Sequence, residues 1–225
     1  MQIQHLRLQC EELLGLQEFY VEHLGFPLIH ASANGFIVQC GDSQLEFAAG
    51  EKAYYHFAFN IFPDQIASAA AWLEARGIAL LPFEDERIVQ FPNWEAEAVY
   101  FYDPAGNILE FIARKRLPAS GNPDFSIAQV LSISEIGFGT YALEDVQRQL
   151  NSTMGLPIFG EAKPHFRALG DDHGLFILVD AATKLWIPMM EPAWPFPFAA
   201  TLSSQGKSWD VKWDNVQLQL VSTGG

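Results

Sequence analysis

Two stretches of this chain repeat the same order of strands and helices, and this repeat constrains the fold more than any other feature. Residues 1–50 read as a strand, a helix and three further strands, because apolar residues alternate over 3–10 and recur at helical spacing over 12–24. Residues 54–115 show the same order, with an alternating strand over 55–61 and a helix whose apolar face includes Ala69 and Leu73 and which ends at Gly77. An internal repeat predicts that equivalent residues of the two copies lie in equivalent places. The sequence therefore predicts an α+β fold of tandem modules, each with the order βαβββ.

The equivalent positions of the two copies hold four side chains that can bind a metal: His5, Glu46, His56 and Glu110. Each lies in a short alternating run, so strand alternation places all four on the face of the sheet away from the helices. Two imidazoles with one or two carboxylates suit a divalent first-row cation that keeps open positions for a substrate. If that face is concave, the four residues converge on one shared metal site.

A change in composition follows the second module. Prolines, Gly121 and Asn122 over 116–124 are typical of a linker. A third strand over 133–141 and a helix over 143–154 come next, and we interpret 125–225 as a second, incomplete domain of the same kind. Its first strand has Ile, Gly and Phe at 136–138, where the earlier units carry a histidine. We therefore predict that this unit has no metal site of its own.

The charge balance narrows the range of partners. The 225 residues include 27 acidic and 13 basic side chains, a net charge of -14, which would repel nucleic acid or an anionic membrane. No apolar run approaches the roughly 18 residues of a membrane span, and the N-terminus lacks the layout of a signal peptide. Cys10 and Cys40 are too few for a disulfide scaffold. We expect a cytoplasmic protein that binds a small molecule.

Two segments carry a resemblance to a known family: Phe-Tyr-Val-Glu-His-Leu-Gly-Phe at 19–26 and Asp-Pro-Ala-Gly-Asn-Ile-Leu-Glu-Phe at 103–111. Together they resemble the vicinal oxygen chelate superfamily, which includes glyoxalase I, extradiol ring-cleaving dioxygenases and bleomycin resistance proteins. The resemblance is clear over 1–115 and partial over 125–225. It implies that 1–115 forms a half-open barrel around one divalent ion, with a partial module of the same type at the C-terminus. The Asp-Pro-Ala-Gly-Asn turn is expected to be structural.

The glyoxalase I branch of that superfamily implies our first functional hypothesis. In that branch all four positions, here His5, Glu46, His56 and Glu110, bind the metal. The metal acts as a Lewis acid and stabilises an enediolate, formed when a carboxylate removes a proton next to a carbonyl. Glu46 or Glu110 would be the catalytic base, and Ni²⁺, Zn²⁺, Mn²⁺ or Co²⁺ would suit this chemistry. The presence of Glu46 favours a lyase or isomerase whose substrate has vicinal oxygens.

Two other branches imply alternatives. Extradiol dioxygenases use three of these positions, and His5, His56 and Glu110 would form their two-His-one-carboxylate Fe(II) site. The aromatic-rich C-terminal segment would fit an apolar substrate of such an enzyme, but its usual acid–base histidine has only His30 as a spare candidate. Bleomycin-resistance-like proteins bind small molecules without a metal, in a cleft between two chains. The sequence leaves open a homodimer and the exchange of modules between chains.

Overall fold

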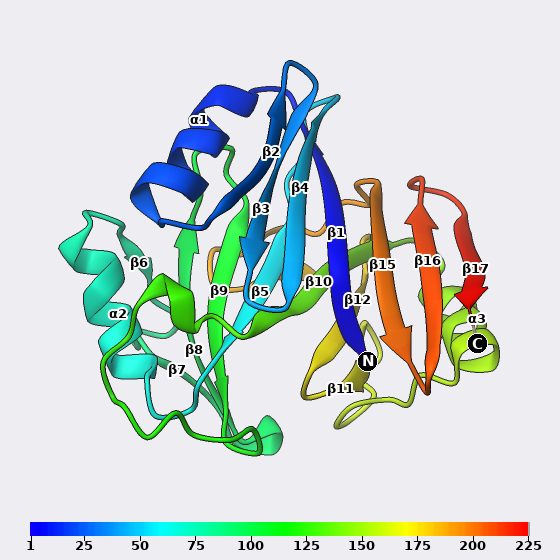
Figure 1. Cartoon of the computed structure of the whole chain (residues 1–225). Coiled ribbons are helices and arrows are strands. Elements are labelled where there is room, and N and C mark those ends of the chain that lie inside the picture. Colours follow the sequence, from blue (N-terminus) through cyan, green and yellow to red (C-terminus); the bar gives the residue numbers. More distant parts are fainter. Residues whose placement is uncertain (225) are drawn as a thin grey trace.

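The computed structural model describes residues 1–224 and confirms the α+β class. Fifteen strands form one mixed sheet, and a separate two-stranded hairpin lies beside it. In the described residues the sheet runs from β17 at one end to β6 at the other without closing into a barrel (Figure 1). None of the helices in this part of the chain has the length and apolar character that a membrane span requires.

The first unit has the predicted order of strand, helix and three strands. Its elements are β1 (Gln2–Cys10), α1 (Leu13–Glu18), β2 (Leu28–Ser32), β3 (Gly35–Cys40) and β4 (Ser43–Ala49). Helix α1 continues directly into one π-helical turn at Phe19–His23, and Gly25 follows with a φ of 85°. The helix predicted over 12–24 is therefore confirmed as two consecutive helical segments.

The second unit repeats this order with additional short strands. Its elements are β5 (His56–Ile61), α2 (Ile66–Ala75), β6 (Leu80–Leu81), β7 (Val89–Phe91), a 3-10 turn at Pro92–Trp94, β8 (Ala96–Tyr102) and β9 (Ile108–Arg114). Helix α2 buries the apolar stripe that the sequence predicted, including Ala69 and Leu73. The alternation in β5 places Phe57 and Phe59 in the core that the helices share with the sheet.

The rest of the chain forms a third unit and three further strands. After a 3-10 turn at Ile127–Gln129 come β10 (Ser132–Thr140), α3 (Leu143–Met154), β11 (Phe166–Asp171), β12 (Gly174–Asp180), the hairpin β13 (Leu185–Trp186) and β14 (Glu191–Pro192), and then β15 (Phe198–Ser204), β16 (Lys207–Trp213) and β17 (Leu218–Gly224). Helix α3 has the predicted bounds. Gly155 ends it in the left-handed conformation with a φ of 66°.

The order of strands in the sheet decides which units face each other. Strand β10 lies between β1 and β5, so the first strands of the first two units are not neighbours. Strand β5 pairs with β9 of its own unit and with β10 of the third unit. Strand β1 pairs mainly with β4 of its own unit and with β15. The second and third units therefore form one face together, and the first unit forms another with β15–β17.

Two apolar clusters follow from this arrangement. The larger one joins the helices to the sheet and contains Leu16 of α1, Leu73 of α2 and Leu150 of α3. The smaller one lies on the other face of the second and third units and includes Ala58 and Ile177. Side chains that the alternation sends away from the helices are thus buried in this region. They line a cleft between the second and third units.

The Asp-Pro-Ala-Gly-Asn turn fixes the start of β9 against the start of β5. The carboxylate of Asp103 accepts hydrogen bonds from the backbone and side-chain nitrogens of Asn107, at 2.9 and 2.7 Å, and from the hydroxyl of Tyr20 at 2.9 Å. The side-chain oxygen of Asn107 in turn accepts from the backbone nitrogen of Tyr55 at 2.8 Å. The turn therefore holds the backbone one residue before His56.

Candidate metal centre

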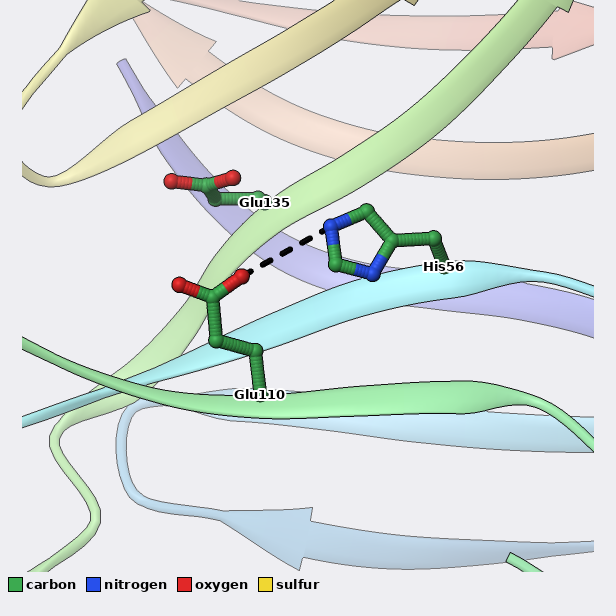
Figure 2. A group of neighbouring side chains, drawn as sticks. All are labelled: His56, Glu110 and Glu135. Carbon is green, nitrogen blue, oxygen red and sulfur yellow. Dashed lines mark ion pairs between the residues drawn. The ribbon is translucent and has the colours of Figure 1, made fainter. Parts of the chain in front are cut away.

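Three side chains from three strands meet at the base of this cleft. His56 lies on β5, Glu110 on β9 and Glu135 on β10. Figure 2 shows the two carboxylates and the imidazole ring gathered over these strands. One ligand atom from each residue lies within 4.8 Å of the other two, and this is the single His/Cys/Asp/Glu group of that kind in residues 1–224. The residues are 5%, 2% and 3% exposed, so the group is almost fully removed from solvent.

Strand register explains how the two carboxylates come together. Ala58 of β5 is the partner of Glu110 on one side and of Glu135 on the other. Neighbouring strands are about 4.8 Å apart, so the two glutamates stand two strand spacings apart with a methyl group between them. The small Ala58 side chain leaves space above β5 into which both carboxylates reach. His56 lies two residues before Ala58 and therefore points to the same side.

The imidazole of His56 is oriented by the backbone. Its Nδ1 lies 3.1 Å from the carbonyl oxygen of Ile108. A carbonyl can only accept, so Nδ1 carries the hydrogen and Nε2 offers its lone pair to the cleft. Nε2 lies 3.6 Å from Oε2 of Glu110. A histidine held by a carbonyl at one nitrogen with the other free is the usual arrangement of a metal ligand.

Burial shifts the ionisation of all three groups. It lowers the pKa of His56 to about 4, so this ring is neutral near pH 7. Burial and the neighbouring charge of Glu135 raise the pKa of Glu110 well above its usual value, although Arg114 and a hydrogen bond from Tyr100 act in the opposite direction. Burial also raises the pKa of Glu135, against the effect of Arg114. The costly state is the one with both carboxylates charged.

This donor set fits a divalent cation. The fully buried Arg114 forms an ion pair with Glu135 through Nη2 and neutralises one of the two carboxylates. With both glutamates ionised the group keeps one uncompensated negative charge, which is expensive in a buried place. A bound cation would remove that cost, and a neutral imidazole with two carboxylates would supply its ligands.

A cavity of about 430 Å³ lies above the three residues. Its walls are largely aromatic, with Trp94, Tyr100, Phe166 and Trp186 among them. The Trp186 ring, on the β13–β14 hairpin, lies 5.1 Å from the ring of His56. The cavity has the size and apolar character of a small-molecule site with a few polar groups at one end.

The structure does not bring the four residues predicted from the sequence together. His56 and Glu110 lie in the cavity just described, whereas His5 and Glu46 line a separate pocket with Arg7, Thr201 and Asp210. Nε2 of His5 lies 3.2 Å from one oxygen of Glu46, and Nε of Arg7 lies 3.3 Å from the other. The His5 and Glu46 side chains are 30% and 19% exposed, so this pair is less buried than the group in the cavity.

The third donor, Glu135, comes from the third unit, for which the sequence predicted no metal site of its own. That prediction compared only 136–138 with the histidine positions of the earlier units and did not consider Glu135. Glu135 lies inside the predicted strand at 133–141, on the cleft-facing parity, and this parity was the signal available in the sequence. The partner unit was missed because nothing in the alternation indicates that β10, and not β1, lies next to β5.

The same register recurs in three units. Arg7, two positions after His5, pairs with Glu46. Ala58, two positions after His56, pairs with Glu110. In the third unit the residue two positions after Glu135 pairs with Ile177. The structure therefore supports the predicted equivalence of the first two pairs. It also shows that an apolar side chain stands at the fourth position of the buried site.

Other polar residues of β5, β7 and β8 have different surroundings. Tyr100 and Gln90 line the cavity. Tyr102 lies in a separate groove beside Glu191, and Asn60 donates to the backbone oxygen of Asp172 at 3.0 Å.

No family model and no curated protein matches the sequence. Solved structures are similar to it over the whole chain or over about half of it. A proposed dioxygenase from Bacillus subtilis is similar over 99% of this chain and 84% of its own length, with a TM-score of 0.65 and 14% identity. A lactoylglutathione lyase from Agrobacterium tumefaciens matches 49% of this chain and 92% of its own length, with a TM-score of 0.42 and 22% identity. A glyoxalase/bleomycin resistance protein/dioxygenase from Nocardioides matches 54% and 89%, with a TM-score of 0.42 and 22% identity.

The similarity to the Bacillus subtilis structure agrees with the α+β fold expected from the sequence and concerns the fold alone. The match over the whole chain includes the third unit and the C-terminal strands, for which the sequence showed only a partial resemblance. At these identities the similarity concerns the fold, so the chemistry has to be argued from the site itself.

Proposed function

We propose that His56, Glu110 and Glu135 hold one divalent cation, and that the protein is a metal-dependent enzyme acting on a small molecule with two adjacent oxygen atoms. The observation that carries this proposal is the convergence of the three side chains within 4.8 Å at the closed end of an aromatic cavity. A protein that only binds an apolar molecule would gain nothing from two buried carboxylates whose charges repel each other.

The donor set favours particular metals. One imidazole and two carboxylates are harder ligands than the two-histidine set expected from the sequence, so Mn²⁺, Fe²⁺, Co²⁺ and Zn²⁺ suit the site better than Ni²⁺. When bound, the cation would act as a Lewis acid toward the substrate oxygens.

The reaction we favour is the proton transfer of a lyase or isomerase, with Glu110 as the base. Within residues 1–224 its carboxylate forms no ion pair with an arginine, which leaves it freer to accept a proton. Glu135 is less free to take a proton, because Arg114 holds its carboxylate. His56 is fixed by Ile108 and stays neutral. Trp186 and the other aromatic walls would keep water from the reacting carbon.

A second candidate is an oxygen-dependent reaction at Fe(II), and the observation that favours it is Ile177. With an apolar residue at the fourth position, His56, Glu110 and Glu135 would hold the ion, and the ion would supply the activation of substrate and O₂. The missing acid–base histidine still argues against the usual ring-cleaving mechanism. Among the cavity-lining residues in the described part of the chain, His56 is the single histidine.

The metal site is tested by a pair of matched substitutions. Glu110→Gln removes a carboxylate from the buried group, and Glu46→Gln removes the carboxylate at the equivalent register position of the first unit. Titration calorimetry with Mn²⁺ and Zn²⁺ should show a loss of affinity of about tenfold or more for Glu110→Gln. The affinity of Glu46→Gln should stay within about twofold of wild type.

Melting curves of the metal-free proteins control for misfolding. Equal losses in both variants, or a loss confined to Glu46→Gln, would refute the assignment of the metal to this cavity. Absence of binding to any divalent cation in the wild type would refute the enzyme proposal as a whole.

The reaction class is tested separately on the loaded protein. A lyase or isomerase of the proposed kind should exchange the carbon-bound hydrogen of an α-hydroxyketone for deuterium in D₂O, and Glu110→Gln should abolish this exchange. Oxygen uptake by the Fe(II)-loaded protein with a catechol, without such exchange, would instead support the second candidate.

A further inference from the structure

The cavity above the buried group has a polar gradient that runs from its base to its mouth. At the base, His56, Glu110 and Glu135 are buried. Above them the walls are aromatic or aliphatic: Trp94 and Phe166 are half-buried, and Trp186 is buried. At the mouth stand Lys163, which is exposed, and Lys184, which is half-buried. A molecule that fills this cavity would therefore meet oxygen-binding groups at one end and ammonium groups at the other.

The two lysines are unusual for this protein. The chain has a net charge of -14 and six lysines in all, so finding two of them at one cavity mouth is unexpected for a random surface. Neither forms an ion pair within residues 1–224, although the chain carries 27 acidic residues. Glu161 is the one carboxylate beside them at the mouth, which leaves this rim with a single net positive charge.

Backbone hydrogen bonds fix the two segments that carry these lysines. Lys163 and Phe166 close a tight turn through reciprocal backbone hydrogen bonds of 3.1 and 3.2 Å. The same turn therefore presents a lysine at the mouth and a ring on the wall. The backbone nitrogen of Lys184 donates to the carbonyl of Asp180 at 2.9 Å, directly before the hairpin that carries Trp186. Each lysine thus stands on the same short segment as one of the aromatic walls.

We infer that the cavity binds a flat, apolar acid: a molecule whose ring lies between the aromatic walls and whose carboxylate, or another anionic group, is held at the mouth by Lys163 and Lys184. This inference rests on the proposed function for the other end of the molecule, where two adjacent oxygens would meet the buried group. The anionic group lies at the end away from these oxygens. A rim with one net positive charge would reject a cationic molecule of the same shape.

The test uses three probes that share a ring and two adjacent hydroxyls and differ in the charge of the tail. They are 3-(3,4-dihydroxyphenyl)propanoate with a negative tail, 4-ethylcatechol with a neutral tail and dopamine with a positive tail. Binding is followed by quenching of tryptophan fluorescence, since Trp94 and Trp186 line the cavity. Each titration is made with metal-free protein and with protein loaded with redox-inactive Zn²⁺.

The variants change the rim without touching the buried group. Lys163→Gln with Lys184→Gln removes both charges from the mouth. Lys52→Gln with Lys207→Gln is the matched control, because it changes the net charge equally at two lysines that do not line the cavity.

The acid should bind about tenfold more tightly than the neutral probe, as expected for two partly exposed ion pairs, and dopamine should bind most weakly. The rim double variant should lose this preference and the control should keep it. The preference should also shrink at high salt.

Equal binding of the acid and the neutral probe, a preference for dopamine, or a preference that survives in the rim variant would each overturn the inference. So would failure of all three probes to bind. These outcomes are separable from failure of the proposed function. The preference for the tail is read in metal-free protein as well, so a protein that binds no metal but prefers the acid would refute the metal proposal alone.

Discussion

Asp103, in the turn before β9, allows a quantitative test of whether burial or hydrogen bonding dominates the pKa of a buried carboxyl. Asp103 is 4% exposed, and burial raises its pKa from 3.8 to about 6, although hydrogen bonds from Asn107, Tyr20 and the backbone of Ala105 oppose this. A carboxyl whose pKa is higher in the folded than in the unfolded protein favours folding while it is protonated. Its contribution is therefore complete below about pH 4 and is lost as the pH rises through about 6. A pKa difference of about two units at about 1.4 kcal/mol per unit corresponds to a loss of about 3 kcal/mol of folding stability.

Asp103→Asn removes this titration and keeps the size of the side chain. The amide places a donor beside groups that already donate, so the variant carries a constant destabilisation that does not depend on pH. We expect the free energy of unfolding of wild type minus that of Asp103→Asn to fall by about 3 kcal/mol between about pH 4 and about pH 7.5. Urea titrations followed by tryptophan fluorescence measure both curves.

Asp64→Asn is the control for this measurement. Asp64 is exposed, and hydrogen bonds from Ser120 and Gly121 lower its pKa. Its contribution is therefore present above about pH 4 and is lost only at lower pH, so its difference curve should be flat across the same range. A flat curve for Asp103→Asn as well would refute the reasoning. A difference that rises with pH would show that the hydrogen-bond donors outweigh burial.

Three further predictions concern the Arg114–Glu135 ion pair, two glycines and the fourth register position. Arg114→Met should destabilise the protein by about 3–5 kcal/mol, because it leaves the charge of Glu135 buried without its partner. Adding Glu135→Gln should recover most of the lost stability in urea titrations. An unchanged loss of stability in the double variant would contradict the ion-pair account. Gly139→Ala should destabilise the protein by about 2–3 kcal/mol, since its Cβ would lie 2.1 Å from a backbone carbonyl oxygen. Gly15→Ala, in a helix with free space around this position, should stabilise the protein by about 0.5–1 kcal/mol. The melting temperatures of the two variants should therefore shift in opposite directions, and a shift in the same direction would refute this reasoning. Ile177→Glu places a carboxylate at the fourth register position, so calorimetry should show about tenfold tighter Mn²⁺ binding, and unchanged or weaker binding would show that this position does not face the metal.

Much of the fold could be predicted from local sequence patterns. The alternation over 55–61 and the apolar spacing over 143–154 predicted β5 and α3 closely, because each depends on contacts within one segment and its immediate layer. The equivalence of His5 with His56 and of Glu46 with Glu110 was also available, since a repeated unit repeats its internal register. Glu135 could have been found by the same parity argument, because it lies in a predicted strand on the cleft-facing side.

The sequence by itself determined the chemistry of each side chain, the face of the strand on which it lies and the pairing of strands within a unit. These properties follow from the two-residue period of a strand and from the short connections inside each module. Only the tertiary structure decided which units face each other. Strand β10 separates β1 from β5, so His56 and Glu110 meet Glu135, while His5 and Glu46 stay together in a separate, more exposed pocket. Neighbours between units depend on pairings over long stretches of chain, and a local period carries no information about them.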